Sequence, residues 1–230
     1  MKRRAFLASA GALAVSACAS PPLGAFLAAE VPAPAWRAGD RWTYRRTDGY
    51  NGLPRGILTR IVESADAGGL RFVTRNETGV VLDDARFGSP GIQVAGTLSE
   101  DGPVRGAFTP PLRMYDFPLV SGKHWRQSLV RADAWGFRTF MRASVRVEGW
   151  EDQRVGDRTY RSIVIRRSLM LGPKDEFSGI LYREELEWYA PELRGAAHKR
   201  TDEMIDAEDE MFGWLPGDRF VYALESFRLG

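Results

Sequence analysis

The residue with the most specific chemical context in this chain of 230 residues is Cys18, its only cysteine. Its thiol closes a short apolar run at residues 6–17, and the basic residues at positions 2–4 precede that run. A positive start, an apolar stretch and small residues at its end are the three parts of a secretory signal. The run is too short, and too rich in Ala, Gly and Ser, for a membrane span of about 20 strongly apolar residues. The sequence therefore predicts export, with a thiol at the end of the signal.

Two cleavage sites are compatible with this segment. Residues 15–18, V-S-A-C, resemble the lipobox of bacterial lipoproteins, and this resemblance implies that Cys18 becomes the lipidated, diacylglyceryl-modified first residue of the mature chain. Palmitate and the other acyl chains attached there would anchor the protein, since two lipid signals already suffice for stable anchoring. Ala17 and Ala19 also satisfy the A-x-A rule of an ordinary signal peptidase, which would cut before Ser20 and discard the thiol.

The export route stays open, whereas the final membrane is indicated by one residue. Residues 3–7, R-R-A-F-L, resemble the twin-arginine export signal, but two arginines serve equally as positive charge for the general secretion route. By resemblance to the lipoprotein sorting rule, Ala19 in place of Asp favours the outer membrane if the host is Gram-negative. We therefore expect a cell-envelope protein that is lipid-anchored and faces the periplasm.

The charge balance argues against a nucleic-acid partner. Residues 1–17 hold three of the 32 basic residues and none of the 30 acidic ones, which leaves 29 basic and 30 acidic residues beyond the signal. Binding to phosphate backbones requires a surplus of clustered Lys and Arg, which a nearly neutral chain lacks. No phosphate-binding glycine loop or dinucleotide fingerprint is present, so we expect no cofactor.

The rest of the chain has the composition of β-strands. We divide it into a signal peptide (1–17), a lipidated tether (18–35) and a single β-rich domain (36–230). In residues 136–150 apolar residues alternate with mostly cationic ones, as in a half-buried antiparallel strand. Further strands are expected at residues 41–47, 56–64, 70–77, 80–86, 124–131, 159–171, 180–189, 196–205 and 219–229. The predicted fold is an all-β antiparallel meander forming a curved sheet, half-barrel or sandwich with few short helical turns.

Two regions interrupt this pattern, and both are places to look for function. Residues 88–120 are dense in Gly and Pro and are expected to form a long loop with at most one short strand. Residues 201–216 join an acidic run to an aromatic cluster and suggest a helical turn before the last strand. In this second region Met211, Phe212, Trp214 and Leu215 are the predicted ligand or partner contacts, because they are expected in a loop where exposed aromatics indicate a contact surface.

Short motifs in the body resemble those of uncharacterised β-rich bacterial envelope proteins, several of them lipoproteins. The motifs are G-D-x-W-x-Y at residues 39–44, F-P-L-x-x-G-x-x-W at residues 117–125, and W-Y-x-P-E at residues 188–192. The body is also distantly similar to the LolA/LolB lipoprotein carriers, which implies a curved antiparallel sheet that holds an acyl chain. No motif carries a binding site over from that family.

The residues that could do catalytic chemistry are sparse. His124 and His198 lack ligand-like neighbours, so we expect no metal site and no histidine-based nucleophile. Glu184, Glu185 and Glu187 could form the carboxylate pair of a glycosidase, but cross-strand pairing with arginines on a solvent-exposed sheet face explains them more simply. Those arginines are Arg138, Arg142, Arg146, Arg166 and Arg167. The seven tryptophans are assigned mainly to the core.

Three functions follow from these observations. The first is a non-enzymatic binding or assembly role toward an amphipathic ligand or an envelope protein, which an apolar cleft beneath residues 88–120 and 211–216 would support. The second is a periplasmic glycan hydrolase that uses Glu184 or Glu187, which two carboxylates in an open groove would support. The third is a purely structural interaction module, whose sheet interior would be filled by side chains. We favour the first.

Overall fold

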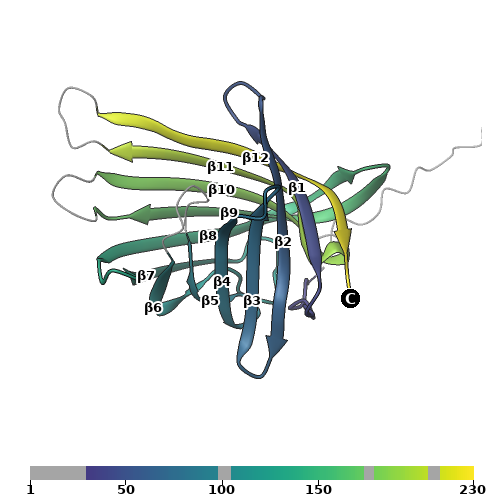
Figure 1. Ribbon diagram of the computed structural model, residues 1–230, viewed down its shortest axis with the longest axis horizontal. Helices are drawn as coiled ribbons and strands as arrows, with labels where there is room; N and C mark the ends of the chain where they lie inside the picture. Colours follow the sequence, from purple (N-terminus) through teal and green to yellow (C-terminus); the bar gives the residue numbers. More distant parts are fainter. Residues whose placement is uncertain (1–29, 98–104, 174–178, 207–212) are drawn as a thin grey trace, which may run out of the picture.

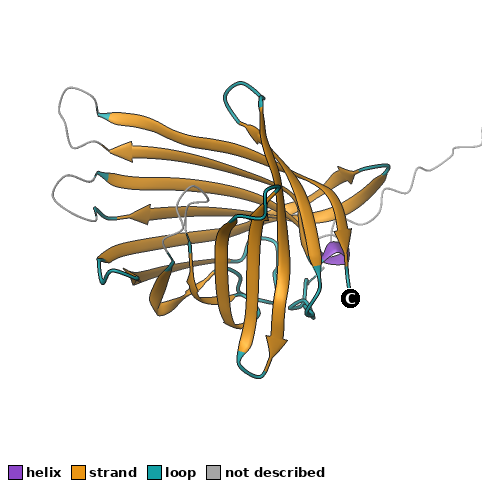
Figure 2. Cartoon of the chain, in the orientation of Figure 1, coloured by secondary structure: helices purple, strands orange, loops and turns teal. Residues whose placement is uncertain are grey.

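The chain forms a closed barrel of twelve antiparallel strands (Figure 1). The computed structural model describes residues 30–97, 105–173, 179–206 and 213–230. The strands are β1 (Arg41–Asp48), β2 (Pro54–Asp66), β3 (Gly69–Asn76), β4 (Val81–Ser89), β5 (Ile92–Gly96), β6 (Gly106–Arg113), β7 (His124–Asp133), β8 (Arg138–Val155), β9 (Arg158–Leu171), β10 (Ile180–Ala190), β11 (Gly195–Asp206) and β12 (Trp214–Arg228). Within the described ranges helical structure is confined to one 3-10 turn, η2 (Pro191–Leu193), seen in Figure 2. No helix in those ranges is long and apolar enough to cross a bilayer.

The all-β antiparallel meander is confirmed, and its form is more specific than expected. Each strand pairs with its neighbour in sequence, and β1 pairs with β12 from Arg41–Arg228 to Asp48–Phe220. The sheet is therefore a closed barrel, a more specific form than the predicted curved sheet, half-barrel or sandwich. Closure satisfies the backbone hydrogen bonds that two open edge strands would leave unpaired. The local pattern could not reveal it, because it depends on a contact between the first and last strands.

The predicted alternation is confirmed in β8 from Thr139 to Val147, whereas Phe137, which was expected on the same face, precedes the strand and is exposed. Thr139, Met141, Ala143, Val145 and Val147 are buried, and the residues between them are exposed. Since successive side chains of a strand point to opposite faces, this pattern places one face of β8 inside the barrel and the other in solvent. The buried face packs against the inward residues of β9, which continue the same core.

The region at residues 88–120 contains two strands, so the prediction of a long loop is wrong there. Strands β5 and β6 complete the barrel between β4 and β7, although β6 pairs with β7 only from Gly106 to Thr109. Pro110 and Pro111 follow, and proline has no N–H to donate to a ladder. Gly- and Pro-rich composition therefore concealed two short, irregular strands.

After β6 the chain folds over the barrel interior. Leu119 is fully buried and forms a two-stranded bridge with Val31, which lies within the predicted tether and is itself buried. Tyr115 is also buried, and its ring lies 5.8 Å from the ring of Tyr189 on β10. This segment brings the hydroxyl of Tyr115 to the inner face of the sheet, where it contacts β10.

The predicted helical turn in residues 201–216 is not found in the described part of that region. Strand β11 continues to Asp206 and β12 begins at Trp214, while residues 207–212 lie outside the described ranges. Gly217 lies within β12 beside a register irregularity, and a Cβ there would lie 3.0 Å from the Cβ of Glu203. Glycine at this position permits the close approach of β11.

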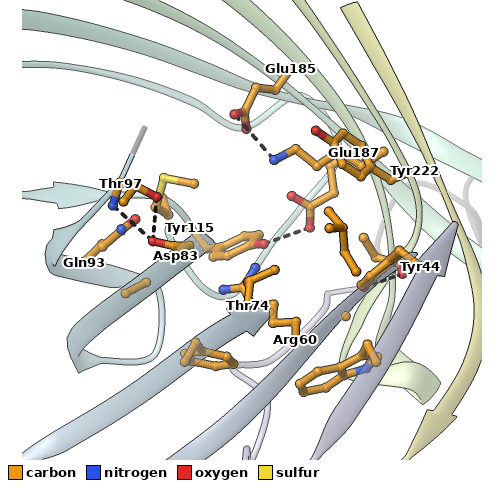
Figure 3. A pocket seen from close by; sticks show the side chains of 18 of the residues that line it. Tyr44, Arg60, Thr74, Asp83, Gln93, Thr97, Tyr115, Glu185, Glu187 and Tyr222 are labelled. Carbon is orange, nitrogen blue, oxygen red and sulfur yellow. Dashed lines mark hydrogen bonds and ion pairs between the residues drawn. The ribbon is translucent and has the colours of Figure 1, made fainter. Parts of the chain in front are cut away.

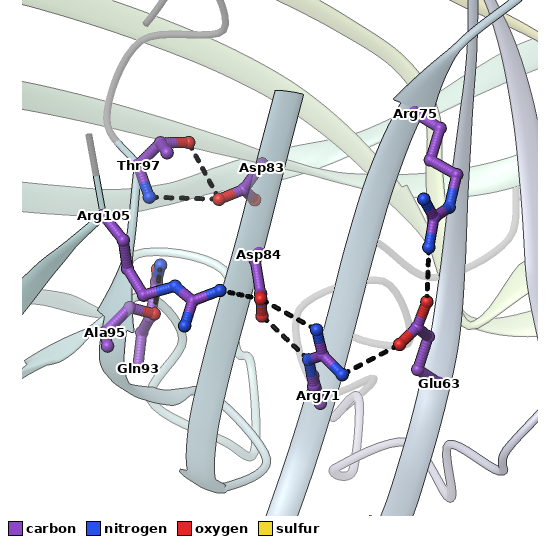
Figure 4. Close-up of polar contacts among 9 residues, drawn as sticks. All are labelled: Glu63, Arg71, Arg75, Asp83, Asp84, Gln93, Ala95, Thr97 and Arg105. Atoms are coloured by element: carbon purple, nitrogen blue, oxygen red, sulfur yellow. Dashed lines mark hydrogen bonds and ion pairs between the residues drawn. The ribbon is translucent and has the colours of Figure 1, made fainter. Parts of the chain in front are cut away.

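The outer face of β2, β3 and β4 carries a chain of ion pairs (Figure 4). Arg71 pairs with Asp84 at 2.9 Å and with Glu63 at 3.0 Å, and Glu63 also pairs with Arg75 at 2.8 Å. Arg105 extends the chain by pairing with Asp84. Glu63 is 30% exposed and the arginines are 38–41% exposed, whereas Asp84 is 9% exposed. Each of the partly exposed pairs of Glu63 is worth at most about 1 kcal/mol. This network lies on the outer face of the three strands, and the cavity described below lies on their inner face.

Candidate functional site

The barrel interior contains a cavity of about 150 Å³, with an aromatic wall and a charged wall. Figure 3 shows how side chains from opposite sides of the barrel converge on it. The aromatic wall includes Trp36, Trp42, Phe72 and Phe87, and the polar wall includes Tyr44, Arg60, Thr74, Asp83, Arg183, Glu185, Glu187 and Lys199. An engineered apolar cavity of about this volume binds benzene. The cavity thus has room for one ring or a short aliphatic chain.

The aromatic wall is rigid because its rings pack on one another and its indoles are anchored. Phe72 on β3 contacts Trp36 edge-on at 5.0 Å between ring centroids and Phe87 at 5.3 Å. The indole N–H of Trp42 donates to the carbonyl of Leu193 at 2.7 Å, and that of Trp36 donates to the carbonyl of Arg194 at 2.7 Å. The turn that follows β10 therefore accepts a hydrogen bond from each of the two indole N–H groups.

The charged wall is organised by strand β10. Arg183, Glu185 and Glu187 alternate along the strand, so their side chains share its inner face. Register places Arg183 opposite Glu203 and Glu187 opposite Lys199 on β11. Arg183 pairs with Glu203 at 3.0 Å and with Glu185 at 2.9 Å. Opposite charges therefore face each other across the ladder inside the barrel.

Arg167 on β9 is the centre of this network. Its Nη1 lies 2.6 Å from Glu187 Oε2 and 3.6 Å from Glu185 Oε2, and its side chain is 1% exposed. Its Nε donates to the carbonyl of Met114 at 3.2 Å, and the Tyr115 hydroxyl donates to Glu187 Oε1 at 2.8 Å. The segment after β6 is thereby tied to the inner face of β9 and β10.

Cations hold both buried carboxylates of β10, Glu185 and Glu187. Burial alone would raise the pKa of Glu185, but Lys199, Arg183 and Arg167 outweigh it and lower that pKa to about 2. Burial and the charge of Glu187 raise the pKa of Tyr115, so its hydroxyl keeps its proton and donates. Glu185 is therefore an anion throughout the physiological pH range.

This arrangement does not suit glycoside hydrolysis. A general acid must keep its proton near neutral pH, which requires a raised carboxyl pKa, whereas that of Glu185 is lowered. Glu184 lies on the outer face of β10, where it pairs with Arg166 at 3.7 Å, and Glu187 lies on the inner face. Glu184 and Glu187 cannot act on the same bond.

The expected cross-strand pairing is confirmed for Glu184, Glu185 and Glu187, but its location was wrong for two of them. Glu185 and Glu187 are buried inside the barrel and not on a wet face. The arginines of β8 remain exposed on the outer face, as their alternation predicted.

Neither histidine lies in the cavity wall. His124 is exposed at the start of β7, and His198 packs its ring 5.0 Å from that of Trp188 on the outer side of β11. Burial lowers the pKa of His198, so this ring is neutral at pH 7. Among the described residues, no three His, Cys, Asp or Glu side chains are grouped closely enough to hold a metal ion.

Comparison with solved structures identifies the fold. A candidate lipoprotein from Parabacteroides distasonis matches with a TM-score of 0.52 and 12% identity, over 86% of this chain and 99% of that chain. An exported-protein candidate with a YmcC-like fold from Bacteroides fragilis matches with a TM-score of 0.51 and 14% identity, over 87% and 100% of the two chains. The fold is YmcC-like.

This likeness concerns the fold alone, since the identities are low. The hypothetical lipoprotein YmcC from Escherichia coli aligns with a TM-score of 0.43 and 9% identity, over 82% of this chain and 84% of that one. No family model matches the sequence, and no curated protein matches it. The two matches with TM-scores above 0.5 agree with the predicted resemblance to β-rich envelope proteins. The curved sheet implied by the LolA/LolB resemblance is closed into a barrel in this chain.

Of the residues predicted as contacts, the two that the structure describes, Trp214 and Leu215, do not line the cavity. Trp214 and Leu215 lie at the start of β12, and not in a loop, and they are exposed by 49% and 42%. The Trp214 ring contacts that of Tyr182 at 4.7 Å. Met211, Phe212 and the lipidation residue Cys18 lie outside the described residues. A contact role for the predicted set stays a prediction.

Several residues of the cavity wall carried no recognisable signal in the sequence. Arg60 lies between Leu58 and Val62 in a run that is apolar on both faces, so its inward direction was not evident. Tyr115 lies in the region taken as a loop. Lys199 lies two residues before Thr201 in a predicted strand, so alternation places the two side chains on the same face. The polar residues around Lys199 gave no sign that this face points into the barrel.

Proposed function

We propose that the protein is a lipid-anchored component of the cell envelope whose barrel interior binds a small amphipathic molecule. The observation that carries the proposal is the cavity between an aromatic wall and a charged wall. A ligand site is typically apolar with a few convergent polar groups. An apolar chain or ring would contact Phe72 and Trp42, and a polar head would face Arg60.

Two further observations support the envelope location. The V-S-A-C segment that ends at Cys18 resembles a lipobox. The proteins with the same fold from Parabacteroides distasonis and Bacteroides fragilis are described as a lipoprotein candidate and an exported-protein candidate. Attachment at Cys18, with the outer membrane as destination in a Gram-negative host, is the anchoring arrangement we propose.

The anchor is tested by the mass of the mature chain. Protein extracted from its own membrane is expected to begin at Cys18 and to carry a diacylglyceryl group, whereas Cys18→Ser abolishes acylation. Intact-mass spectrometry measures both, and Ser20→Ala, which leaves the lipobox unchanged, serves as the control. A wild-type chain that begins at Ser20 contradicts lipid anchoring.

The cavity is tested by filling it. Thr74 lies in the cavity wall, and its hydroxyl makes no hydrogen bond to any residue that the structure describes. Thr74→Phe is therefore expected to fill the space without removing a polar partner. Isothermal titration calorimetry of the mature chain, residues 18–230 with Cys18→Ser, measures binding of hexanoate and hexanol, whose six carbons suit the volume.

We expect Thr74→Phe to weaken binding of both probes by about tenfold or more, since most of their apolar burial is lost. Thr59→Phe is the matched control, because Thr59 lies on the adjacent strand with its side chain on the outer face. Circular dichroism establishes that both variants fold, since overpacking costs about 1–3 kcal/mol. Unchanged binding in Thr74→Phe, or no binding by the reference chain, contradicts the proposal.

A further inference from the structure

We propose that Arg60 recognises an anionic head group, so that the ligand is a carboxylate or phosphate monoester joined to a short apolar chain or ring. This inference rests on the proposed function, whose cavity it refines. Arg60 lies in the cavity wall, on β2, where its side chain enters the space between the two walls (Figure 3).

Arg60 differs from the other cations of the cavity in having no carboxylate partner. Arg183 pairs with Glu185 and Glu203, Lys199 with Glu185 at 3.5 Å, and Arg194 with Asp40 at 3.3 Å. In the part of the chain that the structure describes, no carboxylate lies within ion-pair distance of Arg60 and no group accepts a hydrogen bond from its guanidinium. Its Nε is buried as well.

The carboxylates near Arg60 are committed elsewhere. Arg60 pairs across the ladder with Thr74, and Thr74 pairs with Asp83, so Asp83 lies two strands away at about 10 Å. Asp83 accepts hydrogen bonds from the backbone N–H and hydroxyl of Thr97 at 3.0 and 2.8 Å. Both oxygens of Glu187 are occupied by Arg167 and Tyr115.

The guanidinium is also held in place before any ligand arrives. Its central carbon lies 4.6 Å from the centroid of the Phe72 ring, in a cation–π contact. Phe72 belongs to the aromatic wall, so the charge and the apolar surface are joined at one point. A ligand that binds here is expected to place its anionic group next to its apolar part, as short fatty acids and alkyl phosphates do.

A planar guanidinium forms paired hydrogen bonds with either a carboxylate or a phosphate. Three probes with the same chain distinguish these sources and isolate the charge: hexanoate, hexyl phosphate and hexanol. Calorimetry with the mature chain carrying Cys18→Ser compares them in the reference protein, in Arg60→Gln and in Arg60→Lys. Arg146→Gln is the matched control, since Arg146 is exposed on the outer face of β8.

We expect at least one anion to bind about tenfold more tightly than hexanol to the reference chain, since a charge-assisted hydrogen bond is worth that much. Arg60→Gln removes this preference, so that both anions bind no more tightly than hexanol to the same variant; Arg60→Lys restores part of the preference, and Arg146→Gln has no effect. The tighter of the two anions identifies the head group. If Arg60→Gln does not fold, Arg60→Met, which keeps the packing on Phe72, replaces it.

The outcomes separate this inference from the proposed function. If hexanol and the anions bind equally, or if the preference for the anion survives in Arg60→Gln, the role of Arg60 is wrong and the ligand cavity stands. If none of the three probes binds to the reference chain, the proposed function fails and the inference fails with it.

Discussion

Replacing Arg167 with methionine is expected to lower the free energy of unfolding by about 3–5 kcal/mol. Arg167 is buried and pairs with both Glu187 and Glu185, so its removal leaves two buried carboxylates without their shared cation. It also removes the hydrogen bond to the carbonyl of Met114, which ties the segment after β6 to the barrel. Urea denaturation followed by tryptophan fluorescence measures the loss.

The neighbouring arginine is the matched control for this prediction. Arg166 lies on the outer face of β9, where it pairs with Glu148 at 2.6 Å and its side chain is 39% exposed. Because an exposed pair contributes at most about 1 kcal/mol, Arg166→Met is expected to be nearly neutral. An equal loss in the two variants would show that burial of the Arg167 network does not determine stability.

Acid is expected to destabilise the barrel through Glu185. The pKa of this carboxyl is about 2 in the folded chain against an ordinary value of 4.5. A lowered pKa means that the unfolded chain binds the proton more readily, so the stabilisation is present above about pH 4.5 and is lost as the pH falls toward 2. The size of this contribution is on the order of 3 kcal/mol.

The contribution of Glu185 is isolated by comparing pH profiles of unfolding. The difference in unfolding free energy between the wild type and Glu185→Gln is expected to be constant above pH 5 and to shrink toward pH 2. Glu184→Gln serves as the control, because Glu184 is adjacent in sequence and its side chain is 60% exposed. A difference for Glu185→Gln that does not change with pH would contradict the assigned charge network.

The sequence was informative where one face of a strand is buried and the other is wet. In β8 the apolar residues repeat at every second position, and the predicted strand and its buried face are both found. Prediction failed for β5 and β6, because their glycines and prolines are typical of loops. Barrel closure was also missed, since the pairing of Arg41 with Arg228 is not encoded in any local pattern.

The cavity was harder to predict than the fold, because its wall is assembled from distant segments. Arg60, Tyr115 and Glu187 are separated by long stretches of chain and meet only when the barrel closes. Charged residues on β10 occur on both faces, so the sequence indicated pairing with arginines but could not tell the buried carboxylates from the exposed Glu184. Composition alone assigns such residues to the surface.

The proposal that the barrel holds an amphipathic ligand is tested most directly with protein from its own membrane. Native mass spectrometry of the extracted wild-type chain is expected to show a small, non-covalently bound amphipathic molecule in addition to any lipid attached at Cys18. This molecule should be absent from Thr74→Phe and present in Thr59→Phe. A wild-type chain without such a molecule, or equal amounts in Thr74→Phe, would contradict a ligand-binding interior.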